Sequence, residues 1–511
     1  MPIAVYACRA QIGLQAPSVQ VEVSVAAGLP AFNVVGLAAT VVKESKERVR
    51  AALLHSGFDF PAGRITVNLS PADMPKRSGR FDLPIALGIL TASRQLRSGS
   101  ITRSTEFYGE LGLDGELKAV AGMLLAAAEA QRAGREVLLP CASAAEVAPL
   151  LRMSSRAAIR TADHLRAVCA HMQGTRVLQP LRAESVGDLS TGTTAPPADL
   201  HDVRGQTAAK RALVVAAAGS HSLLMVGPPG AGKSMLAVRL ATLLPPLTES
   251  EALEVAAIAS ASGLQHSFGS RPVRTPHHTS SAVALIGGGV NARPGEISLA
   301  HHGVLFLDEV LEYDRRALEA LREPLECGAV TVSRAAVRAQ YPAQFQLVAA
   351  MNPCPCGRLG DSRGVCRCSP AEVQRYRARL SAPLLERVDI HLEIPRVDLS
   401  EFGETTLPLR STAELGAQVQ QARELQLTRQ GNYNSRLSDD RLERFCALDC
   451  AAGELLARAQ QRFDMSARTR QRILKLARTI ADLEGSALLS ATHVAEAVSY
   501  RFLDRNPTAV T

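Results

Sequence analysis

The first 180 residues alternate between segments with the periodicity of β-strands and segments with that of α-helices. Residues 19–25 (VQVEVSV) place apolar and polar side chains in turn, which is the pattern of a strand with one buried face. Residues 43–55 repeat their apolar positions with helical spacing and stop before Gly57, which favours a helix that ends there. The expected strands are 19–25, 65–69 and 137–140, and the expected helices are 43–55, 83–92 and 123–132. This alternation predicts an α+β unit over residues 1–182.

Composition changes twice along the rest of the chain. Residues 183–199 are small, polar and rich in proline and glycine, as in a linker. Residues 200–398 contain short, strongly apolar runs between helical patterns, which is typical of a parallel sheet covered by helices. The second change surrounds Pro408, and the part of 399–511 that follows it has helical patterns only. The expected fold is an α/β core with a C-terminal helical lid, preceded by the α+β unit.

A phosphate-binding loop begins the core. Residues 223–234 (LLMVGPPGAGKS) form an apolar strand that runs into G-x-x-x-x-G-K-S, and a helical pattern follows over 235–244. Glycines let consecutive N–H groups approach phosphates, and the helix N-terminus adds the positive end of its dipole. Lys233 is predicted to reach the β- and γ-phosphates and Ser234 to hold Mg²⁺. The predicted ATP-binding residues are Gly227, Pro228, Pro229, Gly230, Ala231, Gly232, Lys233 and Ser234.

Two more apolar strands end in polar side chains. Residues 303–309 (GVLFLDE) end in Asp308, a candidate Mg²⁺ ligand through water, and Glu309, a candidate general base for the attacking water. Residues 345–352 end in Asn352, which could orient that water. Because the carboxyl ends of parallel strands meet at one edge of a sheet, these side chains are expected beside Lys233.

The core resembles AAA+ ATPases, and in particular their magnesium-chelatase-like branch. From about residue 1 to residue 503 the chain is similar to the ComM/YifB family of that branch. The resemblance implies that Asn352 is the sensor-1 residue, that Arg387 is an arginine finger completing a neighbour's site, and that Arg468 is the sensor-2 arginine of the lid. An arginine finger has no use in a monomer, so the resemblance also implies a hexameric ring. The shared phrases are 202–206 (DVRGQ), 227–234, 274–279 (RTPHHT), 303–309, 351–357 (MNPCPCG), 383–389 (PLLERVD) and 466–468 (SAR).

Two insertions in the core resemble those of helix-2-insert AAA+ proteins. The interval from Lys233 to Asp308 is longer than a simple strand–helix course requires. Residues 328–338 alternate with period two around a turn, as in a hairpin placed before sensor 1. In a ring both loops would point at the pore, which makes Arg334 and Arg338 candidate DNA contacts. The alternative for each arginine is a solvated hairpin edge.

Four cysteines fall close together: Cys354, Cys356, Cys366 and Cys368. Paired Cys-x-Cys elements across a glycine-containing loop favour a tetrahedral Cys₄ site that holds structural Zn²⁺. An iron–sulfur cluster or four unliganded thiols are the alternatives. The histidine pairs 277–278 and 301–302 are not expected to bind metal, because they lack supporting cysteine or carboxylate spacing.

The N-terminal unit resembles the proteolytic domain of Lon over residues 75–87 and 107–140. Lon proteases use a serine nucleophile activated by a lysine. The serine position falls near residues 80–82 (RFD), and the lysine position falls near Ala126. Ser78 and Lys118 lie nearby but several residues out of place. The expectation is therefore a Lon-like fold without peptidase activity.

Composition limits the function classes further. The chain has 511 residues, of which 46% are apolar and 21% charged, so it should fold rather than remain disordered. A net charge of +8 permits nucleic-acid binding without demonstrating it. No run of 18 uncharged apolar residues and no secretory signal are visible, so a cytoplasmic protein without a membrane partner is expected.

The resemblance implies an ATP-dependent hexameric DNA motor or helicase that acts on single-stranded and branched DNA. In the family this activity promotes branch migration in homologous recombination during natural transformation. A remodelling motor of the magnesium-chelatase type that acts on a protein partner is the alternative. An ATP-dependent protease is disfavoured, because the Ser/Lys pair is out of place.

Overall fold

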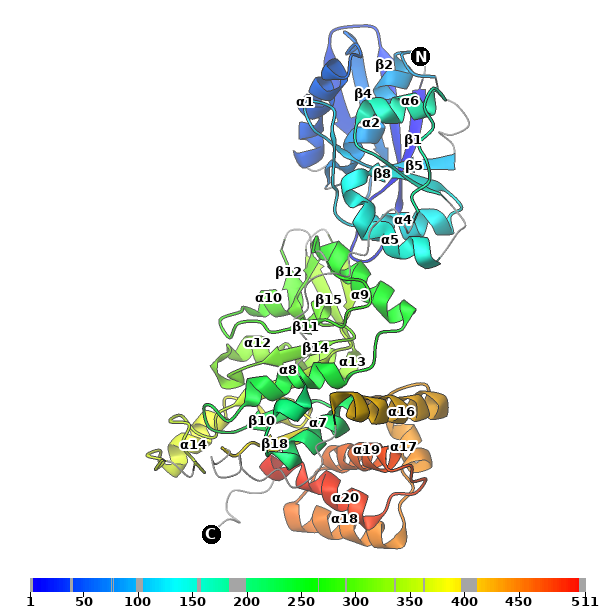
Figure 1. The fold of residues 1–511 in the computed structure, drawn as a ribbon. Helices are drawn as coiled ribbons and strands as arrows, with labels where there is room; N and C mark the ends of the chain where they lie inside the picture. Colours follow the sequence, from blue (N-terminus) through cyan, green and yellow to red (C-terminus); the bar gives the residue numbers. More distant parts are fainter. Residues whose placement is uncertain are drawn as a thin grey trace.

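The computed structural model describes residues 3–36, 40–74, 76, 78–97, 104–153, 158–182, 199–264, 266–289, 292–334, 337–361, 364–396 and 411–504. Figure 1 shows an elongated molecule in which an N-terminal body, a central core and a group of C-terminal helices follow one another along its length. Among the described helices, none is long and apolar enough to cross a membrane.

The N-terminal body is built on a seven-stranded sheet of order β3-β4-β2-β1-β5-β8-β9. The sheet is mixed, because β2 pairs antiparallel with β1 and β4 while β5, β8 and β9 run parallel. Its strands are β1 (Ile3–Arg9), β2 (Ser18–Ala26), β3 (Ala31–Val35), β4 (Arg64–Ser70), β5 (Thr105–Phe107), β8 (Glu136–Pro140) and β9 (Ile159–Ala162). Its helices include α1 (Thr40–His55), α2 (Asp82–Ala92), α4 (Met123–Arg132), α5 (Ala144–Met153) and α6 (Leu165–Met172). All three strands and all three helices expected in this part are present.

Alternation in the sequence explains strand β2 of this sheet. The valines at positions 19, 21 and 23 of β2 are fully buried, whereas Gln20 between them is exposed. Helix α2 is instead buried all round, as its uninterrupted apolar sequence requires.

The central core is a five-stranded sheet of order β11-β14-β17-β10-β18, and each pair in it is parallel. Strands β10, β14 and β17 are buried throughout, which matches their continuous apolar runs. The strands are β10 (Leu223–Val226), β11 (Val273–Arg274), β14 (Val304–Leu307), β17 (Gln346–Met351) and β18 (Ile390–Glu393). Helices α7 (Thr207–Gly219) and α8 (Lys233–Leu243) flank β10 in the sequence. The predicted parallel α/β core is confirmed.

The C-terminal part is helical in all of its described residues except for turns and single bridges. Its helices are α16 (Thr412–Gln430), α17 (Asp439–Phe445), α18 (Cys450–Phe463), α19 (Ala467–Leu483) and α20 (Ala491–Ser499). Helices α16 and α19 pack on α7 and so attach this lid to the core. The predicted helical lid is confirmed.

The core carries two hairpins at the end that approaches the N-terminal body (Figure 1). One is formed by β12 (Gly287–Gly288) and β13 (Arg293–Pro294), within the predicted long interval. The other is formed by β15 (Ala329–Arg334) and β16 (Val337–Pro342), where the second insertion was predicted. Strand β12 contacts β15, so the two hairpins lie side by side.

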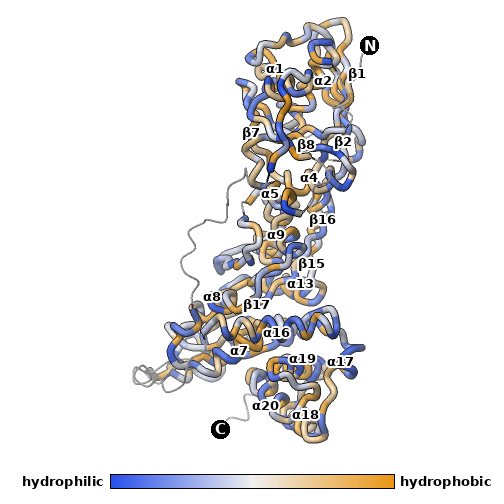
Figure 2. Tube along the Cα trace, turned by 45° about the vertical axis from the view of Figure 1, so that its right-hand side comes forward, coloured by the Kyte–Doolittle hydropathy of each residue, from blue (hydrophilic) through white to orange (hydrophobic). Residues whose placement is uncertain are grey.

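The N-terminal body rests on this end of the core. Helix α4 packs against α9 (Glu249–Ser262), and the Ser260 hydroxyl donates a 2.5 Å hydrogen bond to Glu146. Leu14 packs against both the N-terminal core and the core beneath the hairpins. Figure 2 shows α4 and α5 beside α9 and β16 from a second direction. Through these contacts the two bodies meet at the hairpin end of the central core.

Candidate ATP site

The phosphate-binding loop connects β10 to α8. Gly230 and Gly232 adopt left-handed φ angles of 77° and 89°, which glycine accepts without strain. A side chain at Gly227 would collide with the carbonyl oxygen of Ile394, so the loop can lie close to the sheet only with glycine there. The loop therefore directs its backbone toward the N-terminus of α8, where an anion is favoured.

Lys233 is held inside the loop by three oxygen atoms. Its Nζ donates to the carbonyl oxygens of Gly227 at 2.7 Å and Pro228 at 3.1 Å, and to Oδ1 of Asn352 at 3.2 Å. Burial lowers the pKa of Lys233, against the opposing effect of Asp308 and Glu309. The predicted meeting of Lys233 and Asn352 at one edge of the sheet is thus present in the structure.

Ser234 and Asp308 supply oxygen atoms suited to Mg²⁺. The Ser234 hydroxyl donates a 2.7 Å hydrogen bond to Oδ2 of Asp308, which lies at the end of β14. A hydroxyl and a carboxylate this close are the donor set that Mg²⁺ uses together with phosphate oxygens. The residues therefore fit Mg²⁺–ATP.

Glu309 occupies an unusual backbone conformation. Its φ is +49°, a left-handed value that costs a residue with a side chain on the order of 1–3 kcal/mol. The side chain is 58% exposed, and its Oε2 lies 3.9 Å from Nδ1 of His278. This strain places a carboxylate at the open side of the site, as a general base for water requires. His278 belongs to the RTPHHT phrase and is a neighbour of the base that the sequence did not assign.

Two long-range contacts fix the loop from outside. Gln206 Nε2 donates to the carbonyl oxygen of Ala231 at 2.9 Å, and Arg396 Nη2 donates to that of Pro229 at 3.0 Å. Gln206 is the last residue of the DVRGQ phrase, so the family resemblance could have pointed to it as a contact of the loop. Arg396 lies outside any quoted phrase, and only its position after β18 brings it to the loop.

The four predicted cysteine ligands converge beside the ATP site. All four Sγ atoms lie within 4.8 Å of one another. The Sγ of Cys354 lies 3.4 Å from that of Cys356 and 3.6 Å from that of Cys366. A tetrahedral zinc with Zn–S bonds of about 2.3 Å needs sulfurs about 3.8 Å apart, so this cluster fits Zn²⁺ with little change.

The cysteine loop touches the phosphate-binding loop. A Cβ on Gly357 would lie 2.7 Å from Cδ of Pro229, so the Gly357 backbone lies against the proline ring. Arg396 binds Pro229 and, at 3.2 Å, the carboxylate of Asp361 within the same cysteine loop. The geometry of the cysteine cluster therefore bears directly on the shape of the ATP site.

Arg387 and Arg468 lie away from this ATP site. Both donate to the same carboxylate, that of Glu326: the Arg387 Nη2 distance is 2.6 Å, and Arg468 Nη2 also bonds Oε1. Arg387 precedes β18, so it lies at the amino end of the sheet, whereas Lys233, Asp308 and Asn352 follow the carboxyl ends of their strands. The four residues of β10 span roughly 13 Å, so the amino and carboxyl ends of the sheet are separated by about that distance.

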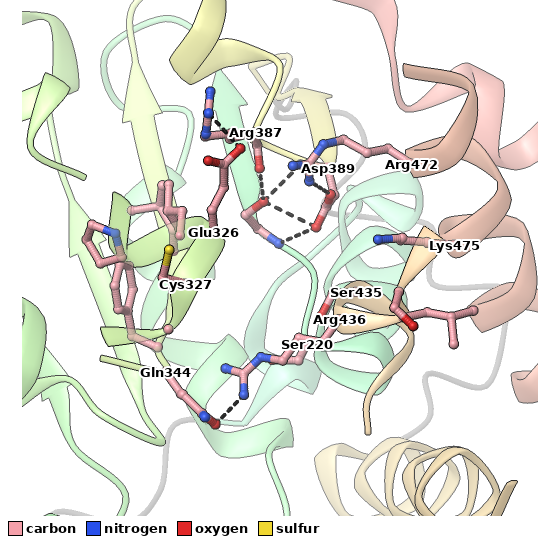
Figure 3. Close-up of a pocket in the computed structure, with 18 of the residues that line it drawn as sticks. Ser220, Glu326, Cys327, Gln344, Arg387, Asp389, Ser435, Arg436, Arg472 and Lys475 are labelled. Carbon is pink, nitrogen blue, oxygen red and sulfur yellow. Dashed lines mark hydrogen bonds and ion pairs between the residues drawn. The ribbon is translucent and has the colours of Figure 1, made fainter. Parts of the chain in front are cut away.

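A pocket of about 500 Å³ between the core and the lid contains these two arginines (Figure 3). Asp389 is buried in its wall and accepts hydrogen bonds from Arg472 and, at 3.1 Å, from the Ser222 backbone N–H. Although burial acts to raise it, Arg472 and His221 hold the pKa of Asp389 far below its ordinary value. This charged lining joins the lid to the amino edge of the sheet. No role was assigned from the sequence to Glu326, Asp389 or Arg472, because their partners lie far from them along the chain.

The second histidine pair does have a carboxylate beside it, which corrects the sequence argument. Glu254 of α9 lies 2.9 Å from Nε2 of His301 and 3.0 Å from Nε2 of His302. The backbone N–H of Gln344 donates to Nδ1 of His301, so the ring proton is on Nε2 and points at Glu254. Burial lowers the pKa of His301 to about 4, which keeps the ring neutral. The Nε2 proton of His301 accounts for its contact with Glu254 as a hydrogen bond.

In the N-terminal body, the positions that align with a Lon serine are occupied by a buried charged network. Arg80 is buried and donates to the carbonyl oxygen of Ala121 at 2.6 Å, and Asp82 is paired with Arg48 at 2.7 Å. Ala126, at the lysine position, is buried in α4. The Ser78 hydroxyl accepts a bond from the Arg80 N–H at a helix start, and Lys118 is exposed on β7 (Leu117–Lys118).

Three family models match successive parts of the chain. The model described as magnesium chelatase, subunit ChlI, matches residues 199–402. A second ChlI model matches residues 21–143, and the ChlI C-terminal model matches residues 410–501. All residues of the candidate ATP site fall within the first match.

Relatives of similar length cover almost all of the chain. The YifB protein of Escherichia coli is 44% identical over 509 residues, which are 99% of this chain and 98% of that protein. The competence protein ComM of Haemophilus influenzae is 43% identical over the same shares. The DNA replication licensing factor Mcm6 of Drosophila melanogaster is 29% identical over 131 residues, 24% of this chain and 15% of that protein.

Proposed function

Because the chain belongs to the ComM/YifB family of magnesium-chelatase-like AAA+ proteins, we propose that it is an ATP-driven ring motor that moves along DNA. The proposed work of the motor is branch migration in homologous recombination, during the uptake of DNA by natural transformation. Its substrates are single-stranded and branched DNA.

Hydrolysis is assigned to residues at the carboxyl edge of the sheet. Mg²⁺–ATP supplies the phosphoanhydride bond that is cleaved. Lys233 binds the β- and γ-phosphates, while Ser234 and Asp308 hold the metal directly and through water. Glu309 accepts the proton of the attacking water, and the Asn352 amide orients that water from the next strand.

The separation of Arg387 and Arg468 from Lys233 carries the proposal of a ring. Residues at the amino end of a protomer's sheet cannot reach that protomer's own γ-phosphate across the strands. In a ring, the same face meets the neighbour's ATP site and can stabilise its transition state, an effect worth about 10³–10⁵ in rate where arginine fingers have been measured. Both arginines therefore act in trans, in a hexamer as the family resemblance implies.

The two adjacent hairpins support DNA as the substrate. Arg338 is exposed on β16, and Arg334 ends β15 on the strand paired with it. In a ring, hairpins from every subunit would present such cations to a strand in the channel, where contacts to phosphates dominate affinity. One full-length relative is named for competence and one partial relative for DNA replication, which favours DNA over a protein partner.

DNA-stimulated ATP hydrolysis tests this function. The wild-type chain is mixed with ATP and Mg²⁺, alone or with single-stranded or four-way branched DNA, and strand displacement from the branched DNA is followed in parallel. We expect a several-fold faster ATPase with DNA and resolution of the branch that requires ATP. An ATPase that DNA leaves unchanged would replace this proposal with a remodelling motor that acts on a protein.

The cysteine cluster is proposed to hold one structural zinc. The purified chain should contain about one zinc ion, as a closed Cys₄ site requires. Replacing Cys356 and Cys366 with serine should abolish zinc binding and weaken ATP binding, because the cluster shapes the loop that touches Pro229. Elemental analysis and ATP titration measure the two effects. Iron with visible absorption would instead indicate an iron–sulfur cluster, and metal-free chains with normal ATP affinity would contradict the assignment.

The Lon-like body is proposed to be a scaffold without peptidase activity. Its candidate serine position is filled by Arg80 and Asp82, which are already bound to other groups. Casein incubated with the chain and ATP is expected to stay intact, and its digestion would restore the protease alternative.

A further inference from the structure

We propose that Glu326 is a positioning residue that sets the two trans-acting arginines in place and couples their position to the hairpin β15–β16. This inference rests on the proposed ring ATPase. It adds a residue that the motif phrases do not contain, and a route by which DNA in the channel can control hydrolysis at the neighbouring protomer's site.

The geometry around Glu326 is the first support. Oε1 accepts hydrogen bonds from both Arg387 and Arg468, so one carboxylate fixes two guanidiniums that come from different parts of the chain. Arg387 is anchored at its other nitrogen by the Pro383 carbonyl oxygen and is only 7% exposed, whereas Arg468 is 45% exposed on the lid. The core arginine is thus fixed in place, and the lid arginine is aligned to it through Glu326.

The electrostatics agree with this arrangement. The hydrogen bond from Arg387 lowers the pKa of Glu326, which favours the charged carboxylate that binds both arginines. Its side chain is 39% exposed, so it can exchange the arginines with a neighbour's phosphates without leaving an isolated charge buried. Such a group can hold both cations in the right place and still release them during the reaction.

The position of Glu326 in the chain is the second support. It lies in the last turn of α13 (Arg322–Cys327), and Gly328, with φ of +65°, turns the chain directly into β15. Helix α13 contacts β15, so a displacement of the hairpin is passed to the helix that carries the carboxylate. The strands of the hairpin and the carboxylate that binds the arginines are therefore parts of one short, continuous segment.

The chain directly after the hairpin also contacts the lid. Gln344, two residues after β16, accepts a hydrogen bond from Arg436 across the pocket in Figure 3. Helix α13, the residues that directly follow β16 and the lid thus line one cavity, which lies at the opposite end of the sheet from the protomer's own ATP site. Movement of the hairpin on DNA is expected to change the alignment of both arginines at once.

Glu326→Gln tests the proposal, and Glu323→Gln is the matched control. Glu323 is exposed on the same helix and forms no hydrogen bond or ion pair with the described part of the chain. We expect Glu326→Gln to reduce kcat about 100-fold, as a displacement of a reacting group by about 1 Å does, with KM for ATP unchanged. Stimulation by DNA should fall to nearly none while the affinity for DNA is retained. The Glu323→Gln chain should keep wild-type values, and Glu326→Asp should recover part of the rate.

Mixed rings separate positioning from a structural defect. Lys233→Ala protomers have intact arginines but a defective ATP site, whereas Glu326→Gln protomers have the reverse. If Glu326 acts through arginines that serve the neighbour, mixing the two variants should give more ATPase than either alone. A mixture no more active than its parts, or a Glu326→Gln chain that behaves like Glu323→Gln, would overturn the proposal. Wild-type chains that hydrolyse no ATP would instead refute the proposed function on which it rests.

Discussion

Replacing Lys233 with alanine should reduce ATP hydrolysis at least about 100-fold, the loss typical when one preorganised charge at a transition state is removed. The ammonium lies between the carbonyl oxygens of Gly227 and Pro228 and the Asn352 amide oxygen. Without it, the charge that develops on the γ-phosphate is left to the metal and the loop N–H groups. Branch resolution should be lost to the same degree.

A steady-state ATPase assay with and without branched DNA measures this effect. Lys46→Ala is the control, because Lys46 is a partly exposed lysine of the N-terminal body that pairs with Glu47. The control should retain full activity. Lys233→Ala chains that hydrolyse ATP at the wild-type rate would show that the phosphate-binding loop is not the catalytic site.

Replacing Arg387 with alanine should reduce kcat by about 10³-fold or more, the effect of removing an arginine finger. ATP affinity should change little, since the residue lies at the opposite end of the sheet from its own ATP site. The lid should keep its place on the core, because Arg468 remains bonded to Glu326 within the same protomer, and we expect the ring still to assemble. This combination of intact binding, intact assembly and lost turnover is the signature of a residue that acts on a neighbour.

Arg379→Ala is the matched control for Arg387→Ala. Arg379 is another arginine of the segment between β17 and β18, and it is 55% exposed and pairs with Glu312. Nucleotide titration, chromatography of the assembled ring and the rate of hydrolysis are compared for both variants. A loss of ATP affinity equal to the loss of rate would place Arg387 in its own site and contradict action in trans.

Much of the fold was predictable because the apolar pattern was simple. Strand β2 alternates because one face is buried, and β10, β14 and, after Gln346, β17 are apolar because helices cover both faces of their sheet. The residues of the candidate ATP site that lie within one protomer were predictable for the same reason. Lys233, Asp308 and Asn352 each end a strand or begin a helix, so the parallel topology alone brings them to one edge.

The residues of the proposed trans half of the site could not be brought together from local patterns. Glu326, Arg387 and Arg468 meet only when α13, the start of β18 and α19 are packed together, and their spacing in the sequence carries no periodic signal. The cysteine loop shows a related limit. Its four thiols were found from their spacing, whereas the contact of Gly357 with Pro229 depends on where β17 places the loop. Glu254 was missed beside His301 for the same reason.

The two unlike ends of the central sheet have a consequence for assembly. In the proposed ring, an ATP half-site at one end and the arginines at the other would make every junction between protomers head-to-tail, a heterologous contact that has no twofold axis. Such a junction does not fix the number of copies, and a slight change of angle would convert a closed ring into a shallow spiral. A spiral would have one gap while its remaining junctions stay complete, so a DNA strand with no free end could enter sideways while hydrolysis continues at the complete junctions.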